Sequence, residues 1–252
     1  MKSSKEKDKF FQNLLKEEKR LWQKGYKQVV GLDEVGRGSL AGPVVAVALT
    51  ITSLISQKKY HSFISFFSQD LKMKDSKKLS PQQREKLYNI LICHPQIKWA
   101  MGKVSEKIID KINILEATKL AMVRALKNLR IKSDFVIIDG NFTFQAKSSN
   151  IWSKIFNLKP SQKPKKNQNF VFSLEKIKNI IKADEKVLSC LLASILAKVI
   201  RDKMIKRLYQ KFPQYGFDKH KGYPTKLHLE MLKRYGPCKI HRKSFKPIKI
   251  SI

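Results

Sequence analysis

The stretch VVGLDEVGRGSLAGPVVAV, residues 29–47, constrains what this chain can fold into more than any other. Two apolar runs that are typical of buried β-strands flank two adjacent acids and a Gly-Arg-Gly turn. We predict strands at 28–34 and 44–51, and their close connection favours an antiparallel pair. Asp33 and Glu34 therefore fall at the end of a core strand, where a buried carboxylate is costly unless another group compensates its charge.

Helices alternate with strands in the rest of the pattern, which predicts an α/β fold with that antiparallel pair inside the sheet. The 252 residues can enclose a substantial core, and a hydrophobic fraction of 42% indicates a globular chain. The Lys-rich segment 145–182, with nine Lys and one Glu, is predicted to be a surface loop or insertion. The predicted helices are 10–22, 81–92, 105–129, a long helix from Asp184 and 225–235, and the further strands are 98–103 and 134–141.

Positive charge dominates the composition, with 53 Lys and Arg against 20 Asp and Glu and a net charge of +33. This excess favours a polyanionic partner, most simply a nucleic acid, although a merely solvated basic surface also fits it. Cys93, Cys190 and Cys238 are widely spaced, which indicates free thiols of a reducing compartment and not a disulfide framework or a zinc site. The N-terminus lacks a secretory signal, and the apolar run 39–55 is too short and too polar to span a membrane. We therefore expect a soluble, cytoplasmic protein.

Four of the few acids lie where a strand is predicted to end or a helix to begin: Asp33, Glu34, Asp139 and Asp184. Clustered carboxylates can hold hard divalent cations such as Mg²⁺, and two such ions can activate a water and stabilise the leaving oxygen of a phosphodiester. Taken singly, Asp139 could instead form a turn with Gly140, and Asp184 could serve only its helix N-terminus. Adjacent strand residues also point to opposite faces, so the first two acids can share one centre only if the pleat is lost or one supplies a backbone carbonyl.

Five segments resemble the ribonuclease HII family, in this order along the chain: GLDEVGRGSLAGPVV, DSKKLSP, IIDGN, KADEKVLSCLLASILAKVIRD and YGFDKHKGYPTKLHL…GPCKIHRKSF. The resemblance implies a ribonuclease H-like fold, with a mixed five-stranded sheet flanked by helices. We predict three parts: a basic N-terminal helical extension (1–27), a catalytic domain (28–203) that contains the insertion, and a C-terminal helical extension (204–252), of which the resemblance implies the last.

The resemblance implies an endonuclease that hydrolyses the RNA strand of RNA/DNA hybrids and incises 5′ to single ribonucleotides embedded in duplex DNA. Two divalent cations, Mn²⁺ or Mg²⁺, would activate the water, leaving a 3′-hydroxyl and a 5′-phosphate. The implied partners are those nucleic acids, with the chain acting as a monomer and without a membrane. The family's catalytic and metal-binding acids fall on Asp33, Glu34, Asp139 and Asp184.

The resemblance also assigns contacts to nucleic acid. The backbone of Gly36, Arg37 and Gly38 would read the 2′-hydroxyl of the ribonucleotide, and Tyr223 would pack against the next sugar. A tight turn and a core tyrosine are the ordinary alternatives. Further candidates for phosphate contacts, each equally well explained as a solvated charge or a local ion pair, are Lys77, Lys198, Arg201, Lys221 and Arg242. We interpret His220 and His241 as structural or phosphate-facing, because they lack the spacing of metal ligands.

Two features depart from the family pattern. Asp139 and Asp184 are 45 residues apart, where the family has a short connection, and the run LSCLLAS after the fourth acid is bulkier than usual. Asp202 lies 18 residues beyond Asp184, about 27 Å along an unbroken helix, so we expect it to pair with a nearby Lys or Arg. Ribonuclease HIII would carry a different tripeptide and an added N-terminal domain, for which the acid pair at position 33 leaves no room. From another class, a non-catalytic basic nucleic-acid binder fits the composition, but the four acids count against it.

Overall fold

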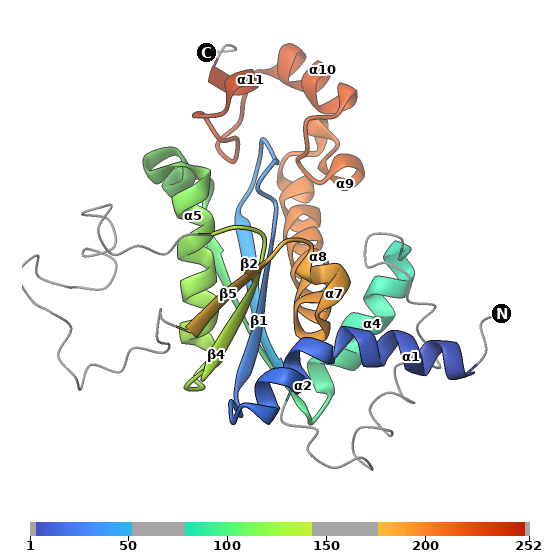
Figure 1. The fold of residues 1–252 in the computed structure, drawn as a ribbon. Helices are drawn as coiled ribbons and strands as arrows, with labels where there is room; N and C mark the ends of the chain where they lie inside the picture. The colour runs from blue at the N-terminus through green and yellow to red at the C-terminus, as the bar shows by residue number, and fades with distance from the viewer. Residues whose placement is uncertain (1–3, 52–78, 143–175, 250–252) are drawn as a thin grey trace, which may run out of the picture.

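The centre of the molecule is a five-stranded sheet with the strand order β3-β2-β1-β4-β5 (Figure 1). The structure is a computed structural model that describes residues 4–51, 79–142 and 176–249. β1 pairs antiparallel with β2 and parallel with β4; β3 extends the antiparallel side, and β5 extends the parallel side. The predicted mixed sheet and its antiparallel pair are therefore confirmed. The strands are β1 (Val29–Val35), β2 (Val44–Ile51), β3 (Ile97–Val104), β4 (Phe135–Asp139) and β5 (Ile177–Ile180).

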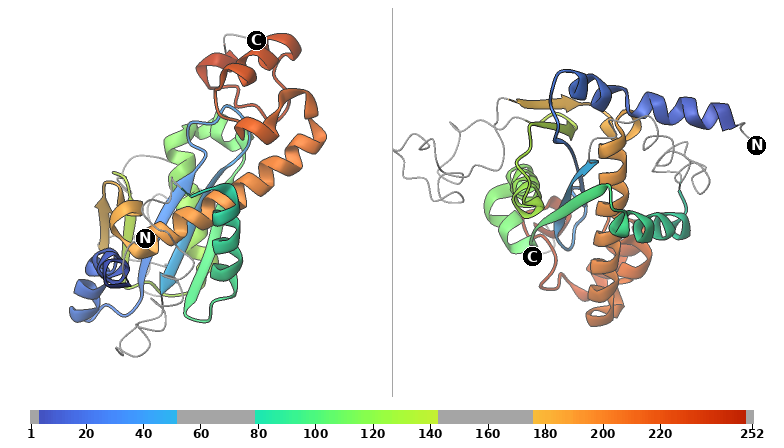
Figure 2. Two further views of the ribbon diagram at one scale, coloured as in Figure 1. Left: turned by 90° about the vertical axis from the view of Figure 1, so that its right-hand side faces the viewer. Right: turned by 90° about the horizontal axis from the view of Figure 1, so that it is seen from below.

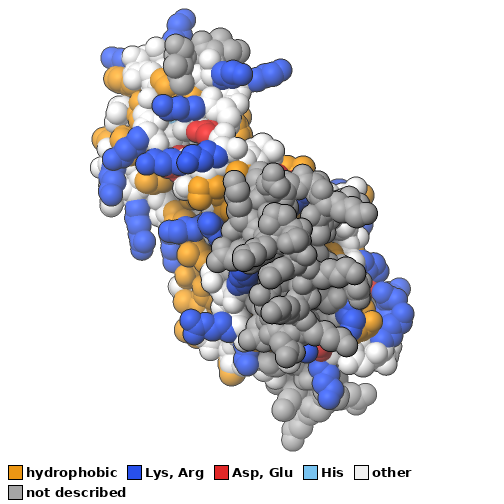
Figure 3. All heavy atoms as spheres, turned by 90° about the vertical axis from the view of Figure 1, so that its left-hand side faces the viewer, with side chains coloured by type: hydrophobic (Ala, Val, Ile, Leu, Met, Phe, Trp, Pro, Cys, Tyr) orange, Lys and Arg blue, Asp and Glu red, His pale blue; other side chains and the backbone are white. Residues whose placement is uncertain are grey.

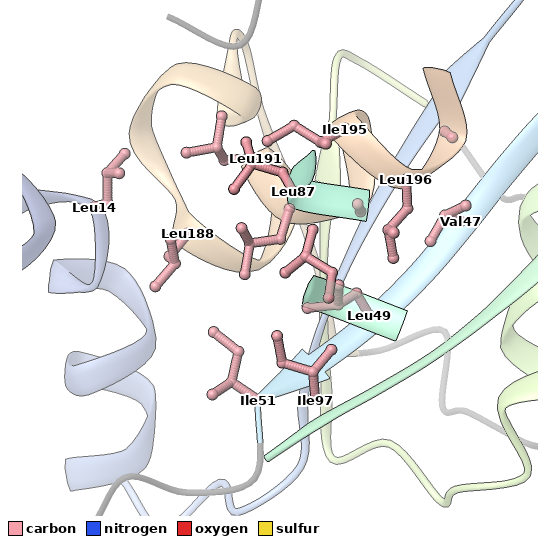
Figure 4. Close-up of a cluster of buried hydrophobic side chains, with 14 of the residues drawn as sticks. Leu14, Val47, Leu49, Ile51, Leu87, Ile97, Leu188, Leu191, Ile195 and Leu196 are labelled. Atoms are coloured by element: carbon pink, nitrogen blue, oxygen red, sulfur yellow. The ribbon is translucent and has the colours of Figure 1, made fainter. Parts of the chain in front are cut away.

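Helices cover both faces of the sheet (Figures 1 and 2). α5 (Glu106–Leu129) packs on one face, and α8 (Leu188–Lys211) with α4 (Pro81–Cys93) packs on the other. All eight residues of β2 are buried, because successive side chains enter alternate cores. Val45, Val47 and Leu49 join the α8 core, which Figure 4 shows, whereas Ala46 and Ala48 join the α5 core.

The N-terminal segment forms two helices, α1 (Ser4–Leu14) and α2 (Lys16–Gln23), where one helix at 10–22 was predicted. The chain bends at Leu15, which lets the two helices serve different cores. Leu14 and Leu15 pack into the α8 core, whereas Leu21 of α2 packs beside β1 and β4.

Two long helices that the sequence predicts as continuous are interrupted. Asn113 has left-handed backbone (φ 63°) inside α5, and its Oδ1 accepts hydrogen bonds from the backbone N–H groups of Leu115 and Glu116. The Asn113 side chain thereby caps a new helical turn. The helix predicted from Asp184 is also broken, because the short α7 (Ala183–Lys186) is followed by an extended Val187 before α8 begins.

β5 lies inside segment 145–182, so the prediction of a loop over that whole segment is wrong at its C-terminal end. Its parallel pairing with β4, from Ile177 opposite Val136 to Ile180 opposite Asp139, stabilises a strand that the polar local sequence does not indicate. Residues 145–175 of the predicted insertion lie outside the described residues.

The C-terminal residues form a small lobe beyond one end of the sheet, to which α8 leads (Figures 1 and 2). It consists of a 3-10 turn (Pro213–Tyr215), α9 (Phe217–His220), α10 (Lys226–Tyr235) and α11 (Lys246–Lys249), which confirms the predicted helix at 225–235. His220 and His241 are buried here, at 7% and 2% exposure, so their structural interpretation is confirmed. Lys and Arg side chains gather on the surface of this lobe (Figure 3). In the described part of the chain, every helix is too short or too polar to traverse a bilayer.

Candidate active site

Asp33, Glu34, Asp139 and Asp184 line one cavity of about 440 Å³. The sheet places the first three, because β1 and β4 are parallel neighbours and end at the same edge. Leu32 pairs with Ile138, so the acids that follow each of these residues come side by side. The other lining residues are Val35, Arg84, Ser194, Ile195, Lys198 and Tyr223.

The fourth acid is delivered by β5 and α7. β5 runs alongside β4, and the Gly140 N–H donates to the carbonyl of Ile180 at 3.1 Å. Asp139 Oδ1 then accepts a 2.7 Å hydrogen bond from the backbone N–H of Ala183, the residue before Asp184. The third acid thus anchors the turn that carries the fourth, whose side chain is buried at 2% exposure.

Asp33 and Glu34 both line the cavity although they are neighbours on a strand. The ladder between β1 and β2 stays in register through Val35, so loss of the pleat, one of the two alternatives that the sequence left open, does not occur. The Asp33 carboxylate accepts a 2.7 Å hydrogen bond from the backbone N–H of Glu34, the next residue along the strand. Both acids therefore line one cavity although they lie on a regularly paired strand.

The carboxylates raise one another's proton affinity. Burial raises the pKa of Asp33 well above its ordinary value, the charges of Glu34 and Asp139 raise it further, and a hydrogen bond with the Ser194 side chain opposes them. Burial also raises the pKa of Glu34 to about 7, although Arg37 forms a 3.2 Å ion pair with it. Burial and mutual repulsion therefore outweigh the positive charge of Arg37 at Glu34, even though Arg84 and Lys198 also line the cavity.

A divalent cation fits this donor set. Its potential ligands are carboxylate oxygens, which hard cations prefer, and a bound cation would relieve the repulsion that raises the pKa of Asp33 and Glu34. Across the described residues, no three His, Cys, Asp or Glu side chains are already drawn together as a finished ion site. The acids share a cavity without closing to the separations that a bound ion would impose.

The Gly-Arg-Gly loop and Tyr223 lie beside the acids. Tyr223 lines the same cavity, and Lys198 Nζ lies 5.8 Å from the centre of its ring. Gly38 is open on its side-chain face: among the described residues, no atom lies within 4 Å of where a Cβ would be. Gly36 differs, because its Cβ would lie 2.2 Å from Nε of Arg201, and its φ is +93°.

The predicted phosphate contacts lie in different surroundings. Lys198 lines the cavity and forms a 2.9 Å ion pair with Asp202. This confirms the prediction that Asp202 pairs with a nearby Lys or Arg. The ammonium group of Lys221 hydrogen-bonds to the backbone carbonyl of Asp218, and Lys221 does not line the cavity. Lys77 falls outside the described residues.

Arg201 and Arg242 are not surface phosphate contacts, and the prediction that they contact phosphates is wrong. Both are buried at 0% exposure, and their guanidinium groups donate to backbone carbonyls. Burial lowers the pKa of Arg242 to about 9. Neither side chain can reach a nucleic acid at the surface.

The sequence interpretation missed Arg84 and Ser194, which also line the cavity. Ser194 occupies the run LSCLLAS, which was noted only for its bulk, and it hydrogen-bonds to Asp33. Arg84 lies in the first turns of α4, which Ser80 caps and where Pro81 is the first residue. The capped start of this helix was recognised, but the direction of its side chains follows from packing against α8.

Comparisons with known proteins agree with this geometry. The family model described as ribonuclease HII matches residues 30–248. The chain belongs to the ribonuclease HII family. A ribonuclease HII of Chlamydia trachomatis serovar L2 is 42% identical over 252 residues, covering 100% of this chain and 97% of that protein. One from Caldicellulosiruptor bescii is 41% identical over 234 residues, 93% of this chain and 94% of its own.

A solved structure supports the same fold. The crystal structure of ribonuclease H2 from Pyrococcus horikoshii superposes with a TM-score of 0.59 at 30% identity, covering 89% of this chain and 96% of the archaeal chain. The ribonuclease H-like fold is therefore confirmed. This member of the ribonuclease HII family is a ribonuclease H, an endonuclease that hydrolyses RNA paired with DNA.

Proposed function

We propose that this ribonuclease incises duplex DNA 5′ to a single embedded ribonucleotide, besides cutting longer hybrids, and leaves a 3′-hydroxyl and a 5′-phosphate. One observation carries the proposal: four carboxylates from three distant segments line a single cavity beside the Gly-Arg-Gly loop. Such a site can both cut a phosphodiester and test the adjoining sugar.

Asp33, Glu34, Asp139 and Asp184 would hold the divalent cations, Mn²⁺ or Mg²⁺. When bound, a cation pair supplies an activated water and stabilises the charge on the leaving oxygen. Ser194 fixes the Asp33 carboxylate, and Asp139 fixes the start of α7. The ligands are therefore preorganised by hydrogen bonds to helices α7 and α8.

Basic side chains would position the phosphates around this centre. Lys198 and Arg84 line the cavity with the acids, and a phosphate between them would be held against the metal-binding edge. Lys221, which does not line the cavity, and Lys77, which falls outside the described residues, remain proposed phosphate contacts.

Selection of the ribonucleotide would come from the loop and the tyrosine. The open space at Gly38 lets a ribose approach the backbone closely, and N–H groups there can donate to a 2′-hydroxyl. Tyr223 offers a ring face to the neighbouring sugar, which need not carry a hydroxyl. We also propose that the chain acts as a monomer, with 1–27 and 204–252 as extensions of a catalytic domain at 28–203.

The experiment is incubation with a duplex that contains one ribonucleotide, in Mn²⁺ or Mg²⁺, beside an all-DNA duplex of the same sequence. We expect one cut, 5′ to the ribonucleotide, and an intact control duplex. Asp139→Asn should abolish the cut but leave binding intact or tighter, because repulsion of the phosphate falls. Cutting of the all-DNA duplex, or equal loss of binding and cleavage in Asp139→Asn, would contradict the proposal.

A further inference from the structure

Two arginines, Arg201 of α8 and Arg242 of the C-terminal lobe, are the largest of the fully buried side chains. Among the described residues, no carboxylate forms an ion pair with either guanidinium group. A buried, unpaired cation is expensive, so its retention requires strong compensating hydrogen bonds. Every hydrogen-bond acceptor of these two side chains that the structure describes is a backbone carbonyl.

Arg242 holds the Gly-Arg-Gly loop by its carbonyls. Its Nη2 donates to the carbonyl of Gly36 at 2.7 Å, and its Nη1 donates to that of Arg37 at 2.9 Å. Its Nε and Nη2 also donate to the carbonyl of Gly42 at 3.0 and 2.9 Å. One planar guanidinium thus ties together both ends of the connection between β1 and β2.

Arg201 ties the same connection to the segment that carries Tyr223. Its Nε donates to the carbonyl of Pro43 at 3.0 Å and its Nη2 to that of Ala41 at 3.1 Å. Its Nη1 donates at 3.0 Å to the carbonyl of Lys221, two residues before Tyr223. The guanidinium carbon lies 5.5 Å from the centre of the Tyr223 ring.

The direction of the loop's donors follows from these bonds. In a trans peptide, the C=O and the N–H point in opposite directions, and no cis peptide bond occurs in the described chain. The carbonyl of Gly36 shares a peptide with the N–H of Arg37, and the carbonyl of Arg37 shares one with the N–H of Gly38. Because Arg242 draws both carbonyls inward, both N–H groups point away from the buried guanidinium and out of the protein interior.

We propose that Arg201 and Arg242 are positioning residues for ribonucleotide recognition. They hold the Gly-Arg-Gly donors and Tyr223 as one rigid unit, so that the 2′-hydroxyl and the neighbouring sugar are read together. This inference rests on the proposed function, in which that loop and that tyrosine read the sugars. Neither arginine touches the nucleic acid.

Substitution by lysine distinguishes this positioning role from a simple requirement for a buried positive charge. A lysine at position 242 keeps the positive charge but has a single ammonium group, which cannot match the fork that binds three carbonyls at once. Arg242→Lys should therefore loosen the loop and weaken its selectivity. Arg207→Lys is the matched control, because Arg207 lies on α8 like Arg201 but is exposed.

The test measures dissociation constants for two duplexes that differ by one 2′-hydroxyl, one with a single ribonucleotide and one of DNA only. Asp139→Asn is the common background, so that binding is measured without cleavage. Arg242→Lys should reduce the preference for the ribonucleotide roughly 10- to 100-fold, since losing charge-assisted hydrogen bonds has effects of about that size. Affinity for the all-DNA duplex should be unchanged, and Arg207→Lys should keep the full preference.

Chemical rescue provides a second readout. In the cleavage-competent chain, Arg242→Ala leaves room for a free guanidinium ion, and millimolar guanidinium should restore part of the lost kcat/KM on the single-ribonucleotide duplex. If Arg242→Lys does not fold, Arg201→Lys is judged by the same preference. A folded variant with a lower melting temperature and an unchanged preference would overturn the inference and leave both arginines a purely structural role. Absence of any preference in the Asp139→Asn background alone would instead refute the proposed function.

Discussion

Glu18, a carboxyl buried at 1% exposure, should make the stability of this protein fall as the pH rises through neutrality. It lies on α2, and its Oε1 accepts hydrogen bonds from the backbone N–H and the hydroxyl of Ser189 at the start of α8, both at 2.9 Å. Burial raises the pKa of Glu18 to about 7 from 4.5, although the hydrogen bonds oppose it. The folded state therefore binds this proton more tightly than the unfolded state does.

The sign and size of the effect follow by linkage. Stability from the protonated Glu18 is fully present below about pH 4.5 and is lost as the pH rises through about 7. A shift of this size corresponds to roughly 3 kcal/mol, or a change of about 6–12 °C in melting temperature for a chain of this length. Glu18→Gln cannot ionise, so the free energy of unfolding of the variant relative to the parent should rise by roughly 3 kcal/mol from pH 4.5 to pH 8.

The assay is denaturant unfolding of Glu18→Gln and the parent chain across that pH range. Other groups titrate in both proteins and cancel in the difference. Glu17→Gln is the neighbouring control: burial raises the pKa of Glu17, but Arg20 and Lys178 outweigh it and the net shift is downward. The stabilisation that ionised Glu17 provides is present above the pKa of the unfolded state and is lost in acid. Relative to the parent chain, Glu17→Gln should therefore be least stable at neutral pH. Parallel curves for Glu18→Gln and the parent would refute the reasoning.

Four further variants test the site. Gly38→Ala should fold normally, because nothing described lies within 4 Å of the added methyl, yet lose at least about tenfold in kcat/KM at a ribonucleotide, whereas Gly36→Ala should also lose stability through its clash with a buried arginine. Tyr223→Ala should mainly impair cutting at a lone ribonucleotide, and equal loss on long hybrids would argue against sugar sensing. Arg84→Ala should raise KM and lower the salt slope of binding by about one, and an unchanged slope would remove Arg84 from the phosphate contacts.

The strand-end acids could be predicted because their signals are local. Asp33 and Asp139 each follow an apolar strand and precede a glycine-containing turn, and parallel neighbours end at one edge. β5 could not be predicted in the same way, because its side chains are only partly buried and its stability comes from pairing with β4. The position of Asp184 at a helix start also indicated it as a candidate, but the break at Val187 that separates its short helix from α8 had no clear local signal.

The two buried arginines show a different limit. In a chain with 53 Lys and Arg, nothing in the local sequence distinguishes Arg201 from exposed Arg207 on the same helix. The difference arises from carbonyls at Ala41 and Pro43, about 160 residues away in the chain, that converge on one guanidinium. Only the folded structure shows which arginine side chains are buried and hydrogen-bonded to the backbone.

Mn²⁺ binding to the protein alone tests the central claim most directly. Bound ions would be counted by electron paramagnetic resonance in the parent chain and in Asp33→Asn, Asp139→Asn and Asp184→Asn, with Asp202→Asn as the control because it does not line the cavity. We expect each of the first three variants, changed on three separate segments, to lose Mn²⁺ affinity by about tenfold or more, and the control to bind like the parent. Unchanged affinity in Asp139→Asn or Asp184→Asn would contradict a shared metal centre.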